Sequence, residues 1–131
     1  MLFTARYTSL VFNVTDLDRT EKFYSEIMGI RFERRGFAGE QFLHAKLSEN
    51  FEIDFMVGTP TPGNSPIMVF DLDEGGISDI VASLAEQGVT IVSPVGDAPD
   101  GKGATFRDPD DFAIGLYQAN DKPLSLKGAD K

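Results

Sequence analysis

Short apolar stretches separated by turn residues dominate the chain, and two longer segments have helical spacing instead of strand-like alternation. The first apolar run, Leu10–Val14, predicts a strand. Asp18 lies three positions before Glu21, which is the spacing of a capping box, so we expect a helix to begin at Asp18 and to end at Gly29. Three more strands are predicted downstream, at 30–34, 41–47 and 51–57.

The second half of the chain repeats this order of elements. A strand is predicted at 67–72, and three more at 89–92, 103–106 and 112–117. Between the first of these and the rest lies an apolar stripe with the i, i+3, i+4, i+7 spacing of an amphipathic helix. Its members are Ile77, Ile80, Val81 and Leu84, and Gly88 ends the predicted helix.

The two halves run nearly in phase. Phe12 and Phe70 are 58 positions apart, and Gly29 and Gly88 are 59 apart. Neither half, at under about 60 residues, buries enough surface to be comfortably stable alone, so we expect one α+β domain made of two βαβββ modules. The predicted division is a first module at 1–58, a Pro-rich linker at 59–66, a second module at 67–118 and a polar tail at 119–131. We expect the tail to be frayed, with local packing of Leu124 and Leu126 as the alternative.

Charge and composition exclude several classes of partner. Twelve Lys and Arg against 21 Asp and Glu give a net charge of −9, and an acidic surface repels a phosphate backbone, so we expect no nucleic-acid partner. The chain has no Cys for disulfides or thiolate metal sites, no secretion-signal layout and no apolar run near the roughly 18 residues of a membrane helix. These features favour a cytoplasmic protein with no membrane partner.

Two segments carry a family resemblance. LVFNVTDLDRTEKFYSEIMGIRF in the first module and GATFRDPDDFAIGLYQ at the end of the second resemble the vicinal oxygen chelate superfamily, which includes glyoxalase I, extradiol dioxygenases, fosfomycin-resistance enzymes and bleomycin-resistance proteins. The resemblance covers residues 5 to 118. It implies curved mixed sheets around a concave cavity, and it implies a homodimer, but it does not specify a reaction.

Strand alternation then predicts which side chains face that cavity. If Leu10, Phe12 and Val14 face the helix, the intervening residues of the same strand face the cavity, and the same parity applies to the second module. The resulting ligand-binding candidates are Ser9, Val11, Asn13, Asp54, Ile67, Val69, Gly115 and Tyr117.

The resemblance also implies four metal-ligand places, a His on the first strand and a carboxylate on the last strand of each module. By register these places are Ser9 and Asp54 in the first module and Ile67 and Gly115 in the second. Only Asp54 has a donor of the expected kind. We therefore predict no metal site, no cofactor and no catalytic residue of the family's kind, with a divalent metal held by other ligands as the alternative.

Other polar residues have open interpretations. His44, the only His, is either a lone ligand or general base, or a partly exposed strand residue without an orienting partner, which we favour. Glu52 and Asp54 share one side of a strand and form either a carboxylate pair or a solvated face. Arg34 and Arg35 either receive a ligand carboxylate or carry surface charge.

Two segments rich in Gly, Asp and Pro complete the candidates. Residues 108–111, Asp-Pro-Asp-Asp, predict a structural turn. Residues 96–103, which contain three Gly, predict a mobile loop or lid at the cavity mouth.

Three hypotheses of function follow. The first is a metal-free protein that binds or sequesters a small apolar or aromatic molecule, to which the acidic surface adds a preference for positive charge. The second is a lyase, isomerase or dioxygenase with substitute metal ligands from His44, Glu52 and Asp54. The third is an interaction or regulatory module whose cavity is filled by side chains. Enzymatic activity is left open, with binding favoured.

Overall fold

The computed structural model describes residue 5 and residues 8–63 and 66–127, and the chain separates into two compact units, Met1–Thr61 and Pro62–Lys131. The division falls inside the segment 59–66, whose three Pro residues permit neither a helix nor a central strand. Residues 64 and 65 of this segment and residues 128–131 of the predicted tail lie outside the described residues.

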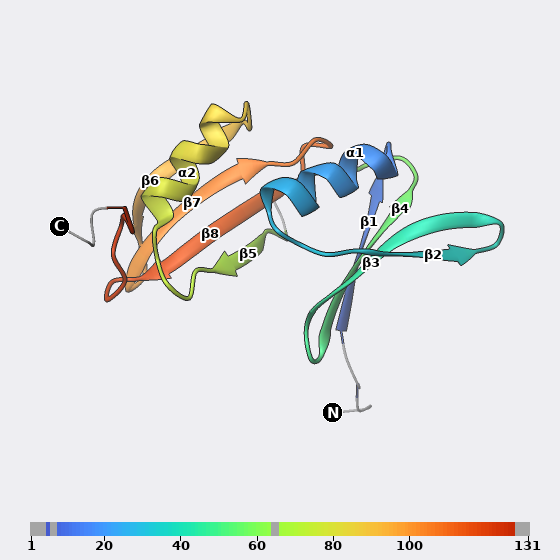
Figure 1. The fold of residues 1–131 in the computed structure, drawn as a ribbon, viewed down its shortest axis with the longest axis horizontal. Coiled ribbons are helices and arrows are strands. Elements are labelled where there is room, and N and C mark those ends of the chain that lie inside the picture. Colours follow the sequence, from blue (N-terminus) through green and yellow to red (C-terminus); the bar gives the residue numbers. More distant parts are fainter. Residues whose placement is uncertain (1–4, 6–7, 64–65, 128–131) are drawn as a thin grey trace. The chain divides into compact units, whose positions relative to one another are not determined.

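Unit 1 is a four-stranded sheet with one helical segment. The strand order is β1-β4-β3-β2, with β1 parallel to β4 and the other neighbours antiparallel (Figure 1). Its elements are β1 (Thr8–Val14), α1 (Leu17–Lys22), a π-helical turn η1 (Phe23–Ile27), β2 (Glu33–Phe37), β3 (Glu40–Ser48) and β4 (Phe51–Val57).

Unit 2 repeats this topology. The strand order is β5-β8-β7-β6, with β5 parallel to β8. Its elements are β5 (Met68–Asp71), α2 (Ile77–Glu86), β6 (Ile91–Ala98), β7 (Gly101–Arg107) and β8 (Ala113–Ala119). The predicted α+β fold of two βαβββ modules with curved, open sheets is therefore confirmed.

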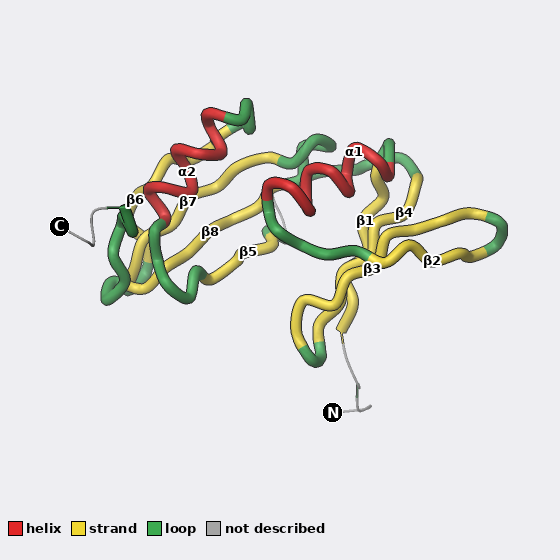
Figure 2. The backbone as a smooth tube through the Cα atoms, viewed as in Figure 1, coloured by secondary structure: helices red, strands yellow, loops and turns green. Residues whose placement is uncertain are grey.

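One helix contacts each sheet, and this decides which side chains are buried. Helix α1 contacts β3 and β4, and α2 contacts β6, β7 and β8 (Figure 2). In unit 1 the ring centroids of Tyr24 and Phe55 lie 4.6 Å apart, and both side chains are fully buried. The predicted alternation in β1 is confirmed, because Val14 is buried whereas Val11 and Asn13 are exposed. Each sheet thus has one helix-covered face and one face that its own helix leaves open.

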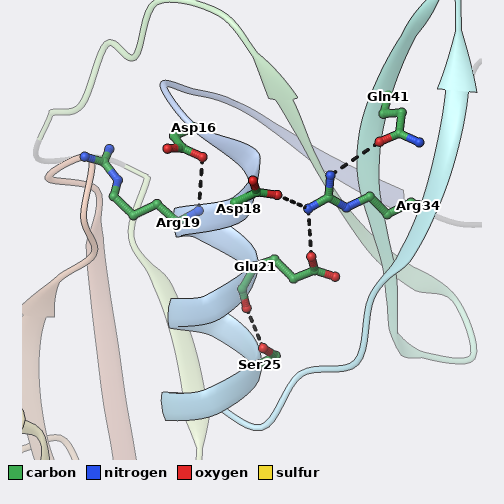
Figure 3. A network of polar contacts seen from close by, with 7 residues as sticks. All are labelled: Asp16, Asp18, Arg19, Glu21, Ser25, Arg34 and Gln41. Atoms are coloured by element: carbon green, nitrogen blue, oxygen red, sulfur yellow. Dashed lines mark hydrogen bonds and ion pairs between the residues drawn. The ribbon is translucent and has the colours of Figure 1, made fainter.

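The first helix begins two residues earlier than predicted. Asp16, not Asp18, is the N-cap, and its carboxylate accepts from the backbone N–H of Arg19 at 3.2 Å (Figure 3). The carboxylate of Asp18 is instead exposed and pairs with Arg34 of β2 at 2.7 Å. The capping-box prediction was wrong because the Asp18 carboxylate pairs with Arg34 on β2 and does not cap the helix.

The segment 96–103 is a hairpin, so the prediction of a loop was wrong. Strands β6 and β7 pair through it, with Asp97 opposite Lys102, and the two side chains form an ion pair. The turn at Pro99 and Asp100 is held from a third strand, since the Tyr117 hydroxyl of β8 donates to the Pro99 carbonyl at 2.6 Å. These cross-strand contacts order a segment whose composition is typical of a loop.

The tail after β8 is not frayed over residues 120–127, contrary to prediction. It crosses the start of α2, where the Gly76 N–H donates to the Pro123 carbonyl at 2.8 Å. The Asp79 carboxylate of α2 accepts from the Ser125 hydroxyl and from the Leu126 N–H, both at 2.8 Å. These bonds, that of Ser125 foremost, lower the pKa of Asp79.

Gln118 joins the sheet, the helix and the tail. Its side chain is fully buried, and its Oε1 accepts from the Ile77 N–H at 2.9 Å. Its Nε2 donates to the carbonyls of Lys122 and Pro123, each at 3.2 Å. A single amide thus satisfies one orphan donor at the start of α2 and two carbonyls of the tail.

We predict that Gln118→Leu lowers the free energy of unfolding by about 2 to 3 kcal/mol, because the substitution leaves the buried Ile77 N–H without its acceptor and removes the amide donor from the Lys122 and Pro123 carbonyls. Urea denaturation followed by circular dichroism measures the change. The matched control is Gln41→Leu on the exposed part of β3, with an expected change within about 0.5 kcal/mol. Equal stability of the two variants would contradict the assigned role of Gln118.

Candidate functional site

The open face of the unit 2 sheet contains a hollow of about 360 Å³. Gly103 of β7 and Gly115 of β8 form its floor, because neither has a side chain that rises from the sheet. Ile67, Val69 and Pro94 supply apolar walls. Ser93, Asp97 and Thr105 contribute the polar groups. A concave apolar surface with few polar groups is typical of a small-molecule site.

Three predicted ligand-binding residues meet in this hollow. A Cβ added to Gly115 would lie 3.0 Å from Cγ2 of Val69 and 3.5 Å from Cγ2 of Ile67. A carboxylate at this position would therefore have to displace the Val69 side chain. The absence of a side chain at Gly115 lets Ile67 and Val69 lie close to the sheet at this position.

Tyr117, the fourth candidate of unit 2, also lines the hollow, but its hydroxyl is engaged in the bond to Pro99. The backbone of Gly101 makes room for the ring, since a Cβ there would lie 2.8 Å from the Tyr117 Cζ. The Tyr117 hydroxyl therefore stabilises the β6–β7 turn, and Tyr117 contributes an aromatic ring to the lining of the hollow.

The candidates of unit 1 lie on the open face of its sheet. Ser9, Val11 and Asn13 are exposed along β1. In the parallel register Val11 lies beside Asp54, just as Val69 lies beside Gly115 in unit 2. Asp54 and Gly115 thus hold equivalent places in the two modules, one with a carboxylate and one without.

His44 brings the carboxylates of β4 together. Its Nδ1 lies 2.7 Å from Oδ1 of Asp54, and its Nε2 lies 3.9 Å from Oε2 of Glu52. The Ser9 hydroxyl donates to the other Glu52 oxygen, Oε1, at 3.3 Å. The side chains of His44, Glu52 and Asp54 are only 9%, 16% and 19% exposed.

The expectation of a partly exposed His44 without an orienting partner was wrong. Strands β3 and β4 form a hairpin in which 42 pairs with 56, 43 with 55 and 44 with 54. The turn alone does not predict this contact, because its 48–51 pair would place 44 opposite 55, and a register shift between Lys46 and Ser48 moves the pairing to 44 and 54.

A second hollow, of about 510 Å³, lies next to His44 on unit 1. Its lining is largely polar, with Glu33, Glu52 and His44 alongside the basic residues Arg31, Arg35 and Lys46. The sequence analysis did not name Arg31 and Phe32 as site residues. They lie in the strand predicted at 30–34, but the observed strand β2 begins only at Glu33, so strand parity does not orient them.

Arg34 and Arg35 are both engaged within the chain. Arg34 pairs with Asp18 and with Glu21, the latter at 2.8 Å, and these bonds, that of Glu21 first, raise its pKa (Figure 3). The Nε atom of Arg35 donates to Oε1 of Glu33 at 3.2 Å, and this hydrogen bond lowers the pKa of the Glu33 carboxyl. The contacts support the interpretation as surface charge over that of a ligand-carboxylate fork.

The turn at 108–111 is structural, as predicted. The Asp108 carboxylate accepts from the backbone N–H groups of Asp110 and Phe112, both at 2.9 Å. Asp111 adopts a φ of 70°, a left-handed conformation that Asp tolerates better than most residues.

The described side chains do not form a metal-binding cluster. Within residues 8–63 and 66–127, no group of three or more His, Cys, Asp or Glu side chains is arranged to hold a metal ion. The carboxylate of Asp54 is turned to the His44 ring, so these two groups bind each other. The residues therefore do not fit the metal centre that the resemblance implies.

We predict that Asp54→Ala changes the tautomer of His44. A carboxylate only accepts, so Asp54 holds the imidazole proton on Nδ1. As His44 is the only His, its ring ¹⁵N NMR signals need no further assignment. The variant should shift these signals toward the Nε2–H tautomer, whereas Glu49→Ala in the exposed turn should leave them unchanged. Identical spectra for native protein and Asp54→Ala would contradict the pairing.

Solved structures share this fold. An antibiotic binding protein, TnmS3, from Streptomyces sp. CB03234 is 23% identical, with a TM-score of 0.73 over 92% of this chain and 99% of that chain. A genomically encoded fosfomycin resistance protein, FosX, from Listeria monocytogenes is 18% identical, with a TM-score of 0.68 over 92% and 97% of the two chains.

A third solved structure, a glyoxalase/bleomycin resistance protein from Streptomyces sp. CB03234, is 24% identical, with a TM-score of 0.64 over 86% of this chain and 99% of that chain. In the described ranges no helix is long and apolar enough to cross a membrane. The family model of the Glyoxalase/Bleomycin resistance protein/Dioxygenase superfamily matches residues 6–116. With the repeated βαβββ topology and this match, the chain belongs to the glyoxalase/bleomycin resistance protein/dioxygenase superfamily.

Proposed function

We propose that this protein binds a small apolar or aromatic molecule in the hollow of unit 2 and acts by holding it instead of transforming it. The observation that carries the proposal is the bare backbone of Gly103 in that hollow. A Cβ at Gly103 would meet nothing closer than 3.4 Å, whereas the place above Gly115 is taken by Val69 and Ile67, which form apolar walls.

The exposed apolar walls support an apolar ligand. Val69 is 57% exposed and Ile67 is 43% exposed, although both are large aliphatic residues. Covering such surface contributes roughly 25 cal/mol per Å², so a ligand that removes about 100 Å² of it from water gains about 2.5 kcal/mol. The hollow is also open rather than filled by side chains of unit 2, which disfavours the hypothesis of a closed interaction module.

The donor set supports action without a metal ion. Three of the four family ligand places hold Ser9, Ile67 and Gly115, and the fourth, Asp54, is bound to His44. A Ser hydroxyl is a poor ligand for the metals that the family's His and carboxylate positions suit, and the other two residues have no donor. We therefore favour binding over metal-dependent lyase, isomerase or dioxygenase chemistry.

A homodimer in the cytoplasm remains part of the proposal. Apolar residues on the open face of each unit, Val11 at 59% exposed and Val69 at 57%, are surface that a second chain or a ligand would cover. The acidic net charge of −9 favours ligands without negative charge.

We predict that planar aromatic compounds raise the melting temperature and that filling the hollow abolishes the effect. The screened panel should include antibiotics, because one structural relative is an antibiotic binding protein. A compound that binds in thermal-shift assays is then titrated by calorimetry into Gly103→Leu, where the nearest atoms to a new Cβ are 3.4 and 3.5 Å away, so the backbone tolerates the change. Affinity should fall at least about tenfold.

The control is Gly36→Leu on β2, where a new Cβ would meet only the Glu40 carbonyl at 3.9 Å. It adds the same side chain to a sheet but lies in the other unit. Loss of affinity in this control, or unchanged affinity in Gly103→Leu, would place the ligand outside the hollow and overturn the proposal.

We predict that the purified native protein carries no stoichiometric transition metal and that ligand binding survives EDTA. Elemental analysis by mass spectrometry measures the first, and calorimetry before and after EDTA treatment measures the second. One tightly held equivalent of iron, zinc, nickel or manganese per chain would contradict the proposal and restore the metalloenzyme alternative.

A further inference from the structure

We propose that the hollow of unit 1 binds a primary ammonium group, held between Nε2 of His44 and Oε2 of Glu52. This inference concerns a different unit from the proposed apolar site and does not rest on it. The notch, as we call the space between these two atoms, lies at the base of the polar hollow of about 510 Å³ that both residues line.

The tautomer of His44 makes both sides of the notch acceptors. Asp54 accepts the Nδ1–H at 2.7 Å, so in the uncharged form of the ring Nε2 presents a lone pair. Among the described residues, Nε2 makes no hydrogen bond, and Glu52 lies 3.9 Å from it. The His44 side chain is 9% exposed, and Nε2 is open to the hollow that the ring lines.

The separation of the two acceptors specifies the missing group. At 3.9 Å they are too far apart to bond each other, since N–H···O bonds span roughly 2.7–3.2 Å. One donor atom about 2.9 Å from both fits between them and must carry two hydrogens directed to different acceptors. A water molecule and an –NH₃⁺ group both meet this requirement, but only the –NH₃⁺ group adds charge complementarity to Glu52. A quaternary ammonium has the charge but no N–H.

The supporting contacts preorganise the notch. Ser9 donates to Oε1 of Glu52 at 3.3 Å, which leaves Oε2 facing His44. Glu52 is only 16% exposed, so an ammonium that reaches it forms a charge-assisted bond with little competition from water.

The charges around the hollow limit the ligand to one positive group. Arg35 is occupied by Glu33, with nitrogen–oxygen distances of 3.2 and 3.4 Å. Arg31 and Lys46 also line the hollow, and both repel a second cation. Lys46 lies opposite Glu52 in the β3–β4 register, so its own ammonium is the internal competitor for the notch.

Three related probes separate hydrogen bonding from charge and shape. Benzylamine, as its ammonium ion, supplies a ring and three N–H donors. Benzyltrimethylammonium keeps the ring and the charge without donors, and benzyl alcohol keeps the ring without charge. Each is titrated at pH 8 into the native chain and into Lys46→Met, and the ring ¹⁵N and ¹H signals of the single His are followed by NMR.

We expect benzylammonium to cause a saturable shift of the Nε2 signal in the native protein or in Lys46→Met. Glu52→Gln, made in both backgrounds, should weaken this binding at least about tenfold, because it removes the charge from one acceptor. Glu49→Gln in the exposed β3–β4 turn is the matched control and should bind as its parent does.

The proposal is overturned if neither chain shows a saturable shift, if benzyltrimethylammonium or benzyl alcohol binds as tightly as benzylammonium, or if Glu52→Gln leaves the affinity unchanged. The circular dichroism spectrum and melting temperature of each variant establish that it is folded. Binding of aromatic compounds to the hollow of unit 2 is measured separately, so the failure of either proposal is distinguishable from the failure of the other.

Discussion

Each sheet has one helical segment that covers one of its faces, and this constraint decides which strand residues are buried. Side chains of one parity pack against the helical segment, as Phe55 of β4 does against Tyr24 of η1, and side chains of the other parity lie on the open face. In both units the first strand lies parallel to the last, which brings residues more than 40 positions apart into one register. This register brings Val11 beside Asp54 in unit 1 and Val69 beside Gly115 in unit 2.

The two modules have used the same backbone for different surfaces. The open face of unit 1 has half-buried carboxylates and a buried imidazole, whereas that of unit 2 has glycines between aliphatic walls. The two proposals rest on this difference, because polar groups in a low dielectric favour a complementary donor and exposed apolar walls favour apolar surface.

Much of this arrangement could be predicted from the sequence, and the failures have physical causes. The strand at 51–57 and the helix that begins at Ile77 are local patterns and were predicted correctly. The hairpin at 96–103 was missed because its order depends on Tyr117 of a third strand. The order of the tail was missed because its bonds to Asp79 join residues that are 47 positions apart in the sequence. Local composition contains no information on such partners.

The site followed the same rule. Strand parity placed Val11 and Val69 on open faces, because alternation is a property of the backbone. The ion pair of Arg34 with Asp18 required knowledge of where the helix lies on the sheet, and the prediction of a cap at Asp18 failed for that reason. The pairing of His44 with Asp54 also escaped prediction, because it depends on a register shift between Lys46 and Ser48 within the β3–β4 hairpin.

The two modules also differ in what stands at the carboxylate place that the family resemblance implies. In unit 2 the carboxylate place is Gly115, and any side chain there must first move Val69, whose Cγ2 lies 3.0 Å from the position of a Cβ. In unit 1 the carboxylate is present but is bound to an imidazole at 2.7 Å, and a metal would have to break that bond. A metal ligand is thus opposed by steric exclusion in unit 2 and by the pairing of Asp54 with His44 in unit 1. The two proposals use the features that accompany these obstacles, which are the apolar hollow of unit 2 and the Nε2 atom of His44 in unit 1.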